Sequence, residues 1–280
     1  MSSTGKTLRM RRILDPATGT AVMFAISHGT GTPKVLKGIE DPRPMVRAVV
    51  EGGANVIFLS RGFAHKCAED IRVNNNVGLA LKVSASCTHY ETPFLEVQTG
   101  TVEHALELGA DAVVAMIPFT YTNEPEVISW AAGLGAECDR WGMPFIAEAE
   151  FPNTYTQQQS DYTSKLGVEY LKRSARLCVE LGADVVKANW TGSIDEFAEI
   201  VQVSNVPVVV AGGSKQSDFD ALQKLAEAMQ AGAVGCSVGR NIFQHKDPVG
   251  MTKAICAVVR QRKSAEEAIK LVRPDARDKR

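Results

Sequence analysis

Short apolar, β-branched runs alternate along this chain with longer amphipathic segments. Each run is followed by a polar loop and then by apolar residues at helical spacing, an order typical of strand–helix units. Several helical segments end in Gly-Ala, where a glycine C-cap and a tight turn into the next strand are expected. The eight runs are residues 20–28, 54–60, 79–86, 111–118, 144–151, 184–190, 206–213 and 233–240.

Eight such units in 280 residues predict an α/β protein built as a single (β/α)₈ TIM barrel, expected over residues 21–249. A doubly wound sheet is the alternative fold for this alternation. Residues 1–20 form an N-terminal extension, and no Pro/Gly-rich linker indicates a second domain. Residues 250–272 are expected to form C-terminal helices, the second beginning at "SAEE", and residues 273–280 a loose tail.

Composition narrows the class of protein. The net charge is −1 and the pI about 6.5, with Lys and Arg spread along the chain, so nucleic acid is not an expected partner. Six cysteines lie far apart, without C-x-x-C or a histidine cluster at metal-ligand spacing, and are expected to be reduced core residues, as in the cytoplasm. We expect neither a signal peptide nor a membrane span, because no apolar run has the required length.

The strands of a TIM barrel direct alternate side chains to the interior and to the surrounding helices. Because the helix-facing side is apolar, polar residues on a strand are expected to point inward. The predicted inward residues are Met23, Ala25 and Ser27 on the first strand, Lys82, Ser84 and Ser86 on the third, Ile146, Glu148 and Glu150 on the fifth, and Val185, Lys187 and Asn189 on the sixth. Two lysines and two glutamates therefore converge near the carboxyl ends of the strands, where barrel active sites lie.

Lys187 is the most informative of these residues, because a charged side chain is rarely buried without a partner or a role. Burial is expected to lower its pKa, so that a free amine can attack a carbonyl and form an iminium ion. This chemistry needs neither a metal nor an organic cofactor, so no cofactor is expected. Two simpler interpretations remain open: Lys187 is only paired with a glutamate, or Lys82 and Glu148 form a structural ion pair.

The ends of the seventh and eighth strands predict a phosphate site. The loops after these strands commonly bind phosphate in TIM barrels, through backbone N–H groups and a helix N-terminus. Gly212, Gly213 and Gly239 allow close approach of the backbone to a ligand. Ser214 adds a hydroxyl and Arg240 a fork of charged donors.

The C-terminal hundred residues contain three long motifs, "GADVVKANWTG", "PVVVAGGSK" and "AGAVGCSVGRNIFQHKDPVGMTKAICAVV". These motifs resemble the family of archaeal-type class I fructose-bisphosphate aldolases. The likeness extends to 2-amino-3,7-dideoxy-D-threo-hept-6-ulosonate synthase and the LsrF proteins, which act on phosphorylated autoinducer-2. The resemblance covers most of the chain, from "RILDPATGTAVMFAISHG" through "ECDRWGMP" to "SAEEAIKLV".

This resemblance implies a Schiff-base (β/α)₈ barrel that acts on a small phosphorylated substrate and is often a decamer. It also implies that Lys187 forms the iminium and that residues 212–214 with 239–240 form the phosphate cradle. The C-terminal helices exceed what a barrel needs and carry the apolar residues Met251, Ile255, Val258 and Val259. We expect these residues to pack against neighbouring subunits of a large ring-based homo-oligomer.

Two departures from the family pattern affect the expected reaction. The family usually has Asp-His-Gly at the end of the first strand, where this chain has Ser27, His28 and Gly29. The family tyrosine after "WGMP" falls on Glu150 or on Phe151, depending on the alignment, and strand alternation favours Glu150 as the replacement acid/base. A different aldol, retro-aldol or acyl-transfer reaction is therefore expected in place of fructose-bisphosphate cleavage.

The leading hypothesis is a lyase or transferase that makes or breaks a carbon–carbon bond in a phosphorylated ketose-like substrate. The candidate catalytic residues are Lys187, Glu150, Ser27, His28, Glu148 and Lys82. The alternatives are an LsrF-like acyl transfer on a phosphorylated dione and a sugar-phosphate-binding barrel that has lost catalysis. A metal-dependent aldolase has the least support, because no histidine and glutamate constellation indicates a metal site.

Overall fold

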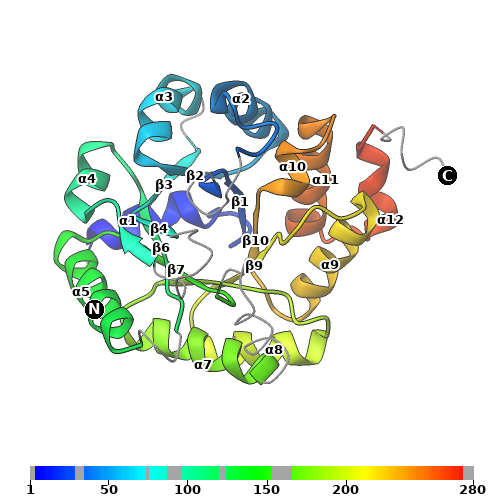
Figure 1. Cartoon of the computed structure of the whole chain (residues 1–280). Helices are drawn as coiled ribbons and strands as arrows, with labels where there is room; N and C mark the ends of the chain where they lie inside the picture. Colours follow the sequence, from blue (N-terminus) through cyan, green and yellow to red (C-terminus); the bar gives the residue numbers. More distant parts are fainter. Residues whose placement is uncertain are drawn as a thin grey trace.

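The computed structural model describes residues 4–28, 35–73, 76–86, 96–119, 124–152 and 166–273. Eight parallel strands close into a barrel in the order β1-β10-β9-β8-β7-β6-β3-β2, with helices around it (Figure 1). The barrel strands are β1 (Ala21–Ala25), β2 (Val56–Ser60), β3 (Gly78–Lys82), β6 (Ala112–Met116), β7 (Phe145–Ala149), β8 (Val185–Ala188), β9 (Val208–Ala211) and β10 (Gly235–Val238). Each coincides with one of the eight predicted runs, and only β3 begins one residue before its run, at Gly78, so the TIM barrel is confirmed.

The helices begin where capping residues stand in the sequence. The side chains of Asp41, Ser193, Ser217 and Asp247 each accept a hydrogen bond from a backbone N–H in the first turn of the following helix. Such a cap stabilises a helix by about 1 kcal/mol. The helices are α1 (Thr4–Ile13), α2 (Pro42–Gly52), α3 (Arg61–Arg72), α4 (Val102–Glu107), α5 (Glu124–Trp141), α7 (Gly167–Glu180), α8 (Ile194–Ser204), α9 (Asp218–Gln230), α10 (Arg240–Phe243), α11 (Pro248–Gln261) and α12 (Ala265–Ala268), followed by the 3₁₀ helix η3 (Ile269–Leu271).

Two buried clusters reflect the alternation of side chains along the strands. The inner cluster fills the barrel and includes Met23, Ala25, Phe58, Val114, Ile146, Val185 and Val209. The outer cluster lies between the strands and the helices and includes Val22, Phe24, Phe145, Ala147, Val186 and Ala188. The inward assignments made for the first, fifth and sixth strands are therefore confirmed for their apolar residues.

Helix α1 covers the amino ends of the strands, which the polar start of the chain did not indicate. Ile13 belongs to the inner cluster, and its carbonyl accepts a hydrogen bond from Asn55 Nδ2 at 3.1 Å. Near the start of α1, Lys6 Nζ lies 2.5 Å from Asp139 Oδ1 and 2.9 Å from Asp184 Oδ2. The amino end of the barrel is thus closed, which leaves the carboxyl end for chemistry.

The third predicted strand is wrong in its second half. The barrel strand β3 ends at Lys82, and β4 (Ser84–Ser86) pairs instead with β5 (Glu96–Gln98) in a separate antiparallel ribbon. The chain turns out of the barrel at Val83, whose carbonyl accepts hydrogen bonds from the N–H groups of Thr99 and Gly100. Ser84 and Ser86 therefore do not line the barrel interior as strand residues.

The prediction that Met251, Ile255, Val258 and Val259 contact neighbouring subunits is also wrong. All four are at most 2% exposed within the single chain. Helix α11 lies between α9 and α2 and completes the ring of helices around the barrel (Figure 1). Its apolar face is needed by the barrel itself, so any oligomer would use another surface.

Two expectations from composition can be compared with the described residues. Five cysteines are free and buried there, as expected for reduced core residues, and Cys87 lies outside the described ranges. Among the helices of the described ranges, none has the length and apolar character needed to cross a membrane. Residues 274–280 of the predicted tail lie outside those ranges.

Candidate active site

Lys187 lies near the carboxyl end of β8, in register with Glu148 on the neighbouring strand β7. Its Nζ atom is 2.6 Å from Glu148 Oε1 and 2.7 Å from Glu150 Oε1. Lys187 and Glu148 are buried, and Glu150 is half-buried. The structure therefore brings together three of the side chains that alternation directs inward.

The expectation that burial lowers the pKa of Lys187 is wrong. Burial does oppose the charged form, but the carboxylates of Glu148 and Glu150 outweigh this effect and raise the pKa of Lys187 above its ordinary value. The resting side chain is therefore an ammonium ion. It must pass a proton to a carboxylate before it can attack a carbonyl.

Glu148 binds a second lysine as well. Its Oε2 atom accepts a hydrogen bond from Lys82 Nζ at the end of β3, and its Oε1 atom accepts one from Lys187. Burial alone would raise the pKa of Glu148, but the two lysines lower it to about 2. The Nζ atoms of Lys82 and Lys187 lie 5.9 Å and 5.8 Å from the centre of the Phe58 ring. Glu148 is thus an ionised bridge between two cations, so the structural ion pair and the candidate nucleophile share one network.

Glu96 on β5 extends this network and is absent from the residues predicted from the sequence. Its Oε1 atom lies 3.6 Å from Lys82 Nζ, and its side chain is fully buried. The hydroxyls of Ser84 and Ser86 donate hydrogen bonds to its two carboxylate oxygens. The one signal in the sequence is an acidic residue inside the apolar run "PFLEV", which gives no hint of the ribbon that brings it to Lys82.

Glu150 and Phe151, the two residues considered for the family tyrosine position, face in different directions. Asn189 Nδ2 donates a hydrogen bond to Glu150 Oε2 at 3.3 Å, while Asn189 Oδ1 accepts one from the Phe151 N–H at 2.7 Å. The Phe151 ring stacks on Tyr170 of α7, with ring centres 5.6 Å apart. Of the two residues, Glu150 is therefore the one in contact with Lys187.

Ser27 and His28 follow the end of β1, and both are half-buried. The His28 ring packs edge-on against Phe243, with ring centres 5.2 Å apart. Burial, and then the positive charges of Lys187 and Arg240, lower the pKa of His28 to about 4. His28 is therefore a neutral imidazole near pH 7.

The low pKa of His28 predicts acid sensitivity of the fold. His28 has its ordinary pKa of 6.5 in the unfolded chain and a pKa of about 4 in the folded one. Between these values the unfolded chain binds more protons, so the free energy of unfolding should fall as the pH decreases through this window. Denaturant titrations across the window should show a shallower pH dependence in His28→Gln. The variant His65→Gln, at an exposed position, should behave like the wild type, and an equal slope in all three proteins would contradict the prediction.

The predicted phosphate residues lie together at the ends of β9 and β10. The Gly212 N–H donates a hydrogen bond to the Ser237 carbonyl at 2.9 Å. A Cβ atom on Gly212 would lie 3.0 Å from Val238 Cα, and one on Gly239 would lie 2.5 Å from the Ala25 carbonyl oxygen. Neither backbone position admits a side chain without a shift of its neighbours.

The remaining residues of this cradle differ in exposure. Gly213 has a φ of +74°, a conformation that favours glycine, and Ser214 is exposed. Arg240 Nε is buried without a hydrogen-bond partner, and Arg240 forms no ion pair within the part of the chain that the structure describes. Lys224 and Asn241, which the sequence did not single out, also reach this loop. Lys224 belongs to an amphipathic helix, where a lysine is normally a surface residue.

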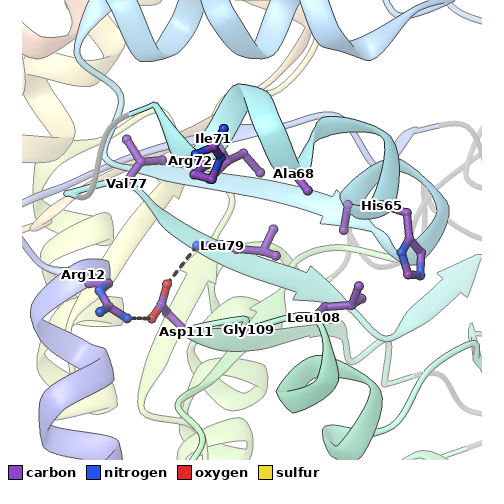
Figure 2. Close-up of a pocket in the computed structure, with 11 residues that line it drawn as sticks. Arg12, His65, Ala68, Ile71, Arg72, Val77, Leu79, Leu108, Gly109 and Asp111 are labelled. Atoms are coloured by element: carbon purple, nitrogen blue, oxygen red, sulfur yellow. Dashed lines mark hydrogen bonds and ion pairs between the residues drawn. The ribbon is translucent and has the colours of Figure 1, made fainter.

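The described residues contain no group of three or more His, Cys, Asp or Glu side chains that could hold a metal ion. A separate hollow of about 300 Å³ lies between α3 and the amino ends of β3 and β6 (Figure 2). There, Arg12 Nη1 lies 2.7 Å from Asp111 Oδ1, and Asp111 Oδ2 accepts a hydrogen bond from the Leu79 N–H at 3.1 Å. This pair attaches α1 to the barrel, at the end opposite Lys187.

Comparison with known proteins decides the family. Residues 20–245 match the model of the DeoC/LacD family aldolases. The chain belongs to this family. It is 33% identical to 2-amino-3,7-dideoxy-D-threo-hept-6-ulosonate synthase of Halobacterium salinarum, over 96% of this chain and 97% of that protein. It is 29% identical to an uncharacterized aldolase of Saccharolobus solfataricus, over 96% of this chain and 99% of that protein.

Solved structures of fructose-1,6-bisphosphate aldolases share the fold. An archaeal fructose-1,6-bisphosphate aldolase, with its catalytic lysine covalently bound to the carbinolamine intermediate of the substrate, superposes with a TM-score of 0.76. It is 25% identical, over 91% of this chain and 99% of that one. A second structure of a Schiff-base-forming fructose-1,6-bisphosphate aldolase gives a TM-score of 0.77 at 26% identity, with the same coverage. The protein is therefore an enzyme of the Schiff-base aldolase class, a lyase.

Proposed function

We propose that this DeoC/LacD-family aldolase makes or breaks a carbon–carbon bond in a phosphorylated ketose-like substrate through a Schiff base on Lys187. The observation that carries the proposal is the position of Lys187 Nζ, 2.6 Å from Glu148 and 2.7 Å from Glu150. An amine between two carboxylates has both a counter-ion and a proton acceptor within reach. The covalently bound catalytic lysine of the archaeal fructose-1,6-bisphosphate aldolase supports the same chemistry here.

The two carboxylates have different roles because their surroundings differ. Glu148 bridges two lysines, which lower its pKa to about 2, so it remains ionised and acts as the counter-ion. Glu150 contacts one lysine and Asn189, and its side chain is 20% exposed, so it takes the proton from Lys187. The neutral amine then attacks the substrate carbonyl. In the adduct, one proton moves from the nitrogen to the oxygen to give the carbinolamine, and Glu150 returns the other to that oxygen, which leaves as water.

Cleavage of the carbon–carbon bond follows from the iminium ion. A base removes the proton of the hydroxyl beyond the scissile bond, an aldehyde forms, and the electron pair of the broken bond moves to the iminium nitrogen. Protonation of the resulting enamine and hydrolysis of the iminium restore Lys187. The iminium carries the same single positive charge as the resting ammonium ion, so Glu148 can stabilise it without rearrangement. Synthesis uses the same steps in reverse.

Reductive trapping tests this proposal directly. The enzyme is incubated with a panel of phosphorylated ketones and ketoses in the presence of borohydride, and the peptides are analysed by mass spectrometry. We expect one reduced adduct, located on the peptide that contains Lys187. If no member of the panel adds covalent mass, the Schiff-base proposal is wrong.

We further propose that the natural substrate differs from fructose 1,6-bisphosphate. Ser27 stands where archaeal-type aldolases usually have an aspartate, and their tyrosine falls on Glu150 or Phe151, so both usual proton-transfer partners have changed. The 33% identity to a hept-6-ulosonate synthase supports a substrate other than a simple hexose. The same changes leave open an acyl transfer on a phosphorylated dione, and a dependence of turnover on coenzyme A separates this second candidate from an aldol reaction.

The phosphate cradle predicts a large effect of Arg240→Ala on ligand affinity. Arg240 provides a guanidinium with no ion pair among the described residues, so an incoming phosphate can take up its charge-assisted hydrogen bonds. Losing these bonds should weaken binding by about 1.5–3 kcal/mol, as for hydrogen bonds to charged groups. Calorimetry with a phosphorylated ketone that the trapping panel identifies, added without borohydride, measures the loss. Arg176→Ala, which removes an exposed arginine of α7, should bind normally, and equal affinity in both variants would place the phosphate elsewhere.

A further inference from the structure

Two side chains hold the loop that joins β9 to α9. Lys224 Nζ of α9 donates a hydrogen bond to the Gly212 carbonyl at 2.8 Å. Asn241 Nδ2 of α10 donates to the carbonyls of Gly212 and Ser214, each at 3.2 Å, and Asn241 Oδ1 accepts from the Gln216 N–H at 2.9 Å. Of these two residues, Asn241 is only 2% exposed. Neither has a part in the covalent chemistry proposed above.

Both side chains approach the loop from the same side. Lys224, Asn241 and Gly212 line one small cavity, together with apolar residues of β10, α9 and α11. That cavity lies between the strands and the surrounding helices. The carbonyls of Gly212 and Ser214 are therefore directed toward the helices, away from the barrel axis.

The direction of these two carbonyls fixes the direction of the N–H groups that follow them in the chain. In a planar trans peptide, the C=O of one residue and the N–H of the next point in opposite directions. The Gly213 N–H must therefore point away from Lys224, and the Lys215 N–H away from Asn241, which directs both toward the barrel mouth. Within the described ranges, no hydrogen bond uses either of these N–H groups.

We propose that Lys224 and Asn241 are positioning residues of the phosphate site, which fix two carbonyls on the helix side and thereby direct the N–H groups of Gly213 and Lys215 at the substrate phosphate. The proposal rests on the proposed function, because it assigns the phosphate of that substrate to this loop. Lys224 also places a positive charge behind the loop. This charge stabilises a bound anion across the width of one peptide group.

The electrostatics around Lys224 agree with such a role. Burial, together with the smaller effect of the positive charges of Arg240 and Lys187, lowers the pKa of Lys224 to about 8, although Glu150 and Cys236 oppose the shift. A bound phosphate would favour the ammonium form of Lys224, so binding should be accompanied by proton uptake and should weaken as the pH rises above about 8. A lysine that only supports the fold would not link phosphate affinity to pH in this way.

Two probes with the same carbonyl group test the proposal, namely dihydroxyacetone phosphate and dihydroxyacetone. The concentration that gives half-maximal borohydride trapping is measured for each probe in the wild type, Lys224→Met and Asn241→Asp. Asn241→Asp removes the two donated bonds and keeps the accepted one, and Lys253→Met, at an exposed lysine of α11, is the matched control. We expect both cradle variants to need about tenfold more dihydroxyacetone phosphate, as for one lost bond to a charged group, with no change for dihydroxyacetone.

Equal losses for both probes, or no loss for the phosphorylated one, would overturn the proposal. If the wild type traps neither these probes nor any member of the phosphorylated panel, the proposed function fails, and calorimetry with inorganic phosphate still tests the loop by itself. The positioning role is then supported by two results: Lys224→Met binds phosphate more weakly than the wild type, and the phosphate affinity of the wild type falls above about pH 8. Equal phosphate affinity in the wild type, Lys224→Met and Lys253→Met would contradict it.

Discussion

Lys187→Met is expected to lower turnover by at least about a thousandfold and to abolish covalent trapping of phosphorylated ketones. Methionine has a similar length and no amine, so carbinolamine and iminium can no longer form. Glu148 and Glu150 remain, but the amine whose charge Glu148 balances and whose proton Glu150 accepts is gone. Single-turnover assays and mass spectrometry after borohydride reduction measure the two effects independently.

Lys82→Met is the matched control, because Lys82 binds the same carboxylate. Each variant leaves Glu148 with one cation in place of two, and removing one partner of a buried ion pair costs about 3–5 kcal/mol. Both variants should therefore lose stability in thermal unfolding, whereas only Lys187→Met should lose the adduct. An adduct that persists in Lys187→Met and disappears in Lys82→Met would make Lys82 the nucleophile.

Most of the barrel could be predicted because its pattern is local. Each strand is a short apolar run, each helix has its own periodicity and cap, and the period of two places Lys187, Glu148 and Glu150 on one face. Parallel strands then bring these residues to one end of the barrel without any knowledge of loops. The contact between Lys187 and Glu150 at 2.7 Å follows from that geometry.

The parts that could not be predicted depend on contacts between distant segments. Glu96 reaches Lys82 through an antiparallel ribbon of two three-residue strands, too short to show a pattern. Lys224 lies on a helix, and its contact with the Gly212 carbonyl depends on how that helix packs. The direction of the pKa shift of Lys187 depends on how many carboxylates contact it, because burial and charge act in opposite directions.

The same argument explains the wrong interpretation of α11. An apolar helix face after the last strand has the same pattern whether it packs on the barrel or on another subunit. Its place between α9 and α2 is set by closure of the ring, which is a property of the whole chain (Figure 1). The burial of Met251 and Val259 therefore shows a core contact where the sequence alone indicated an exposed face.

Glu150→Gln is expected to reduce kcat by about 10²–10⁴-fold, the usual range for loss of a general acid/base. Glutamine has the size of glutamate and can still bind Asn189, but it cannot take the proton of Lys187 or return it to the carbinolamine oxygen. Trapping should be reduced less than turnover, because Glu148 still pairs with Lys187 at 2.6 Å. Steady-state assays and trapping time courses on the same protein separate the two effects.

The pH profile gives Glu150→Gln a second, signed readout. The Glu150 carboxylate contributes to the raised pKa of Lys187, so its removal should lower that pKa. The rate of Schiff-base formation should therefore begin to rise at a lower pH in the variant than in the wild type. Phe151→Leu is the matched control, because it changes the neighbouring residue, whose ring stacks on Tyr170, and should leave both turnover and the profile near normal. If Phe151→Leu loses activity and Glu150→Gln keeps it, Glu150 is not the acid/base. Its contact with Lys187 would then contribute only to the pairing of charges.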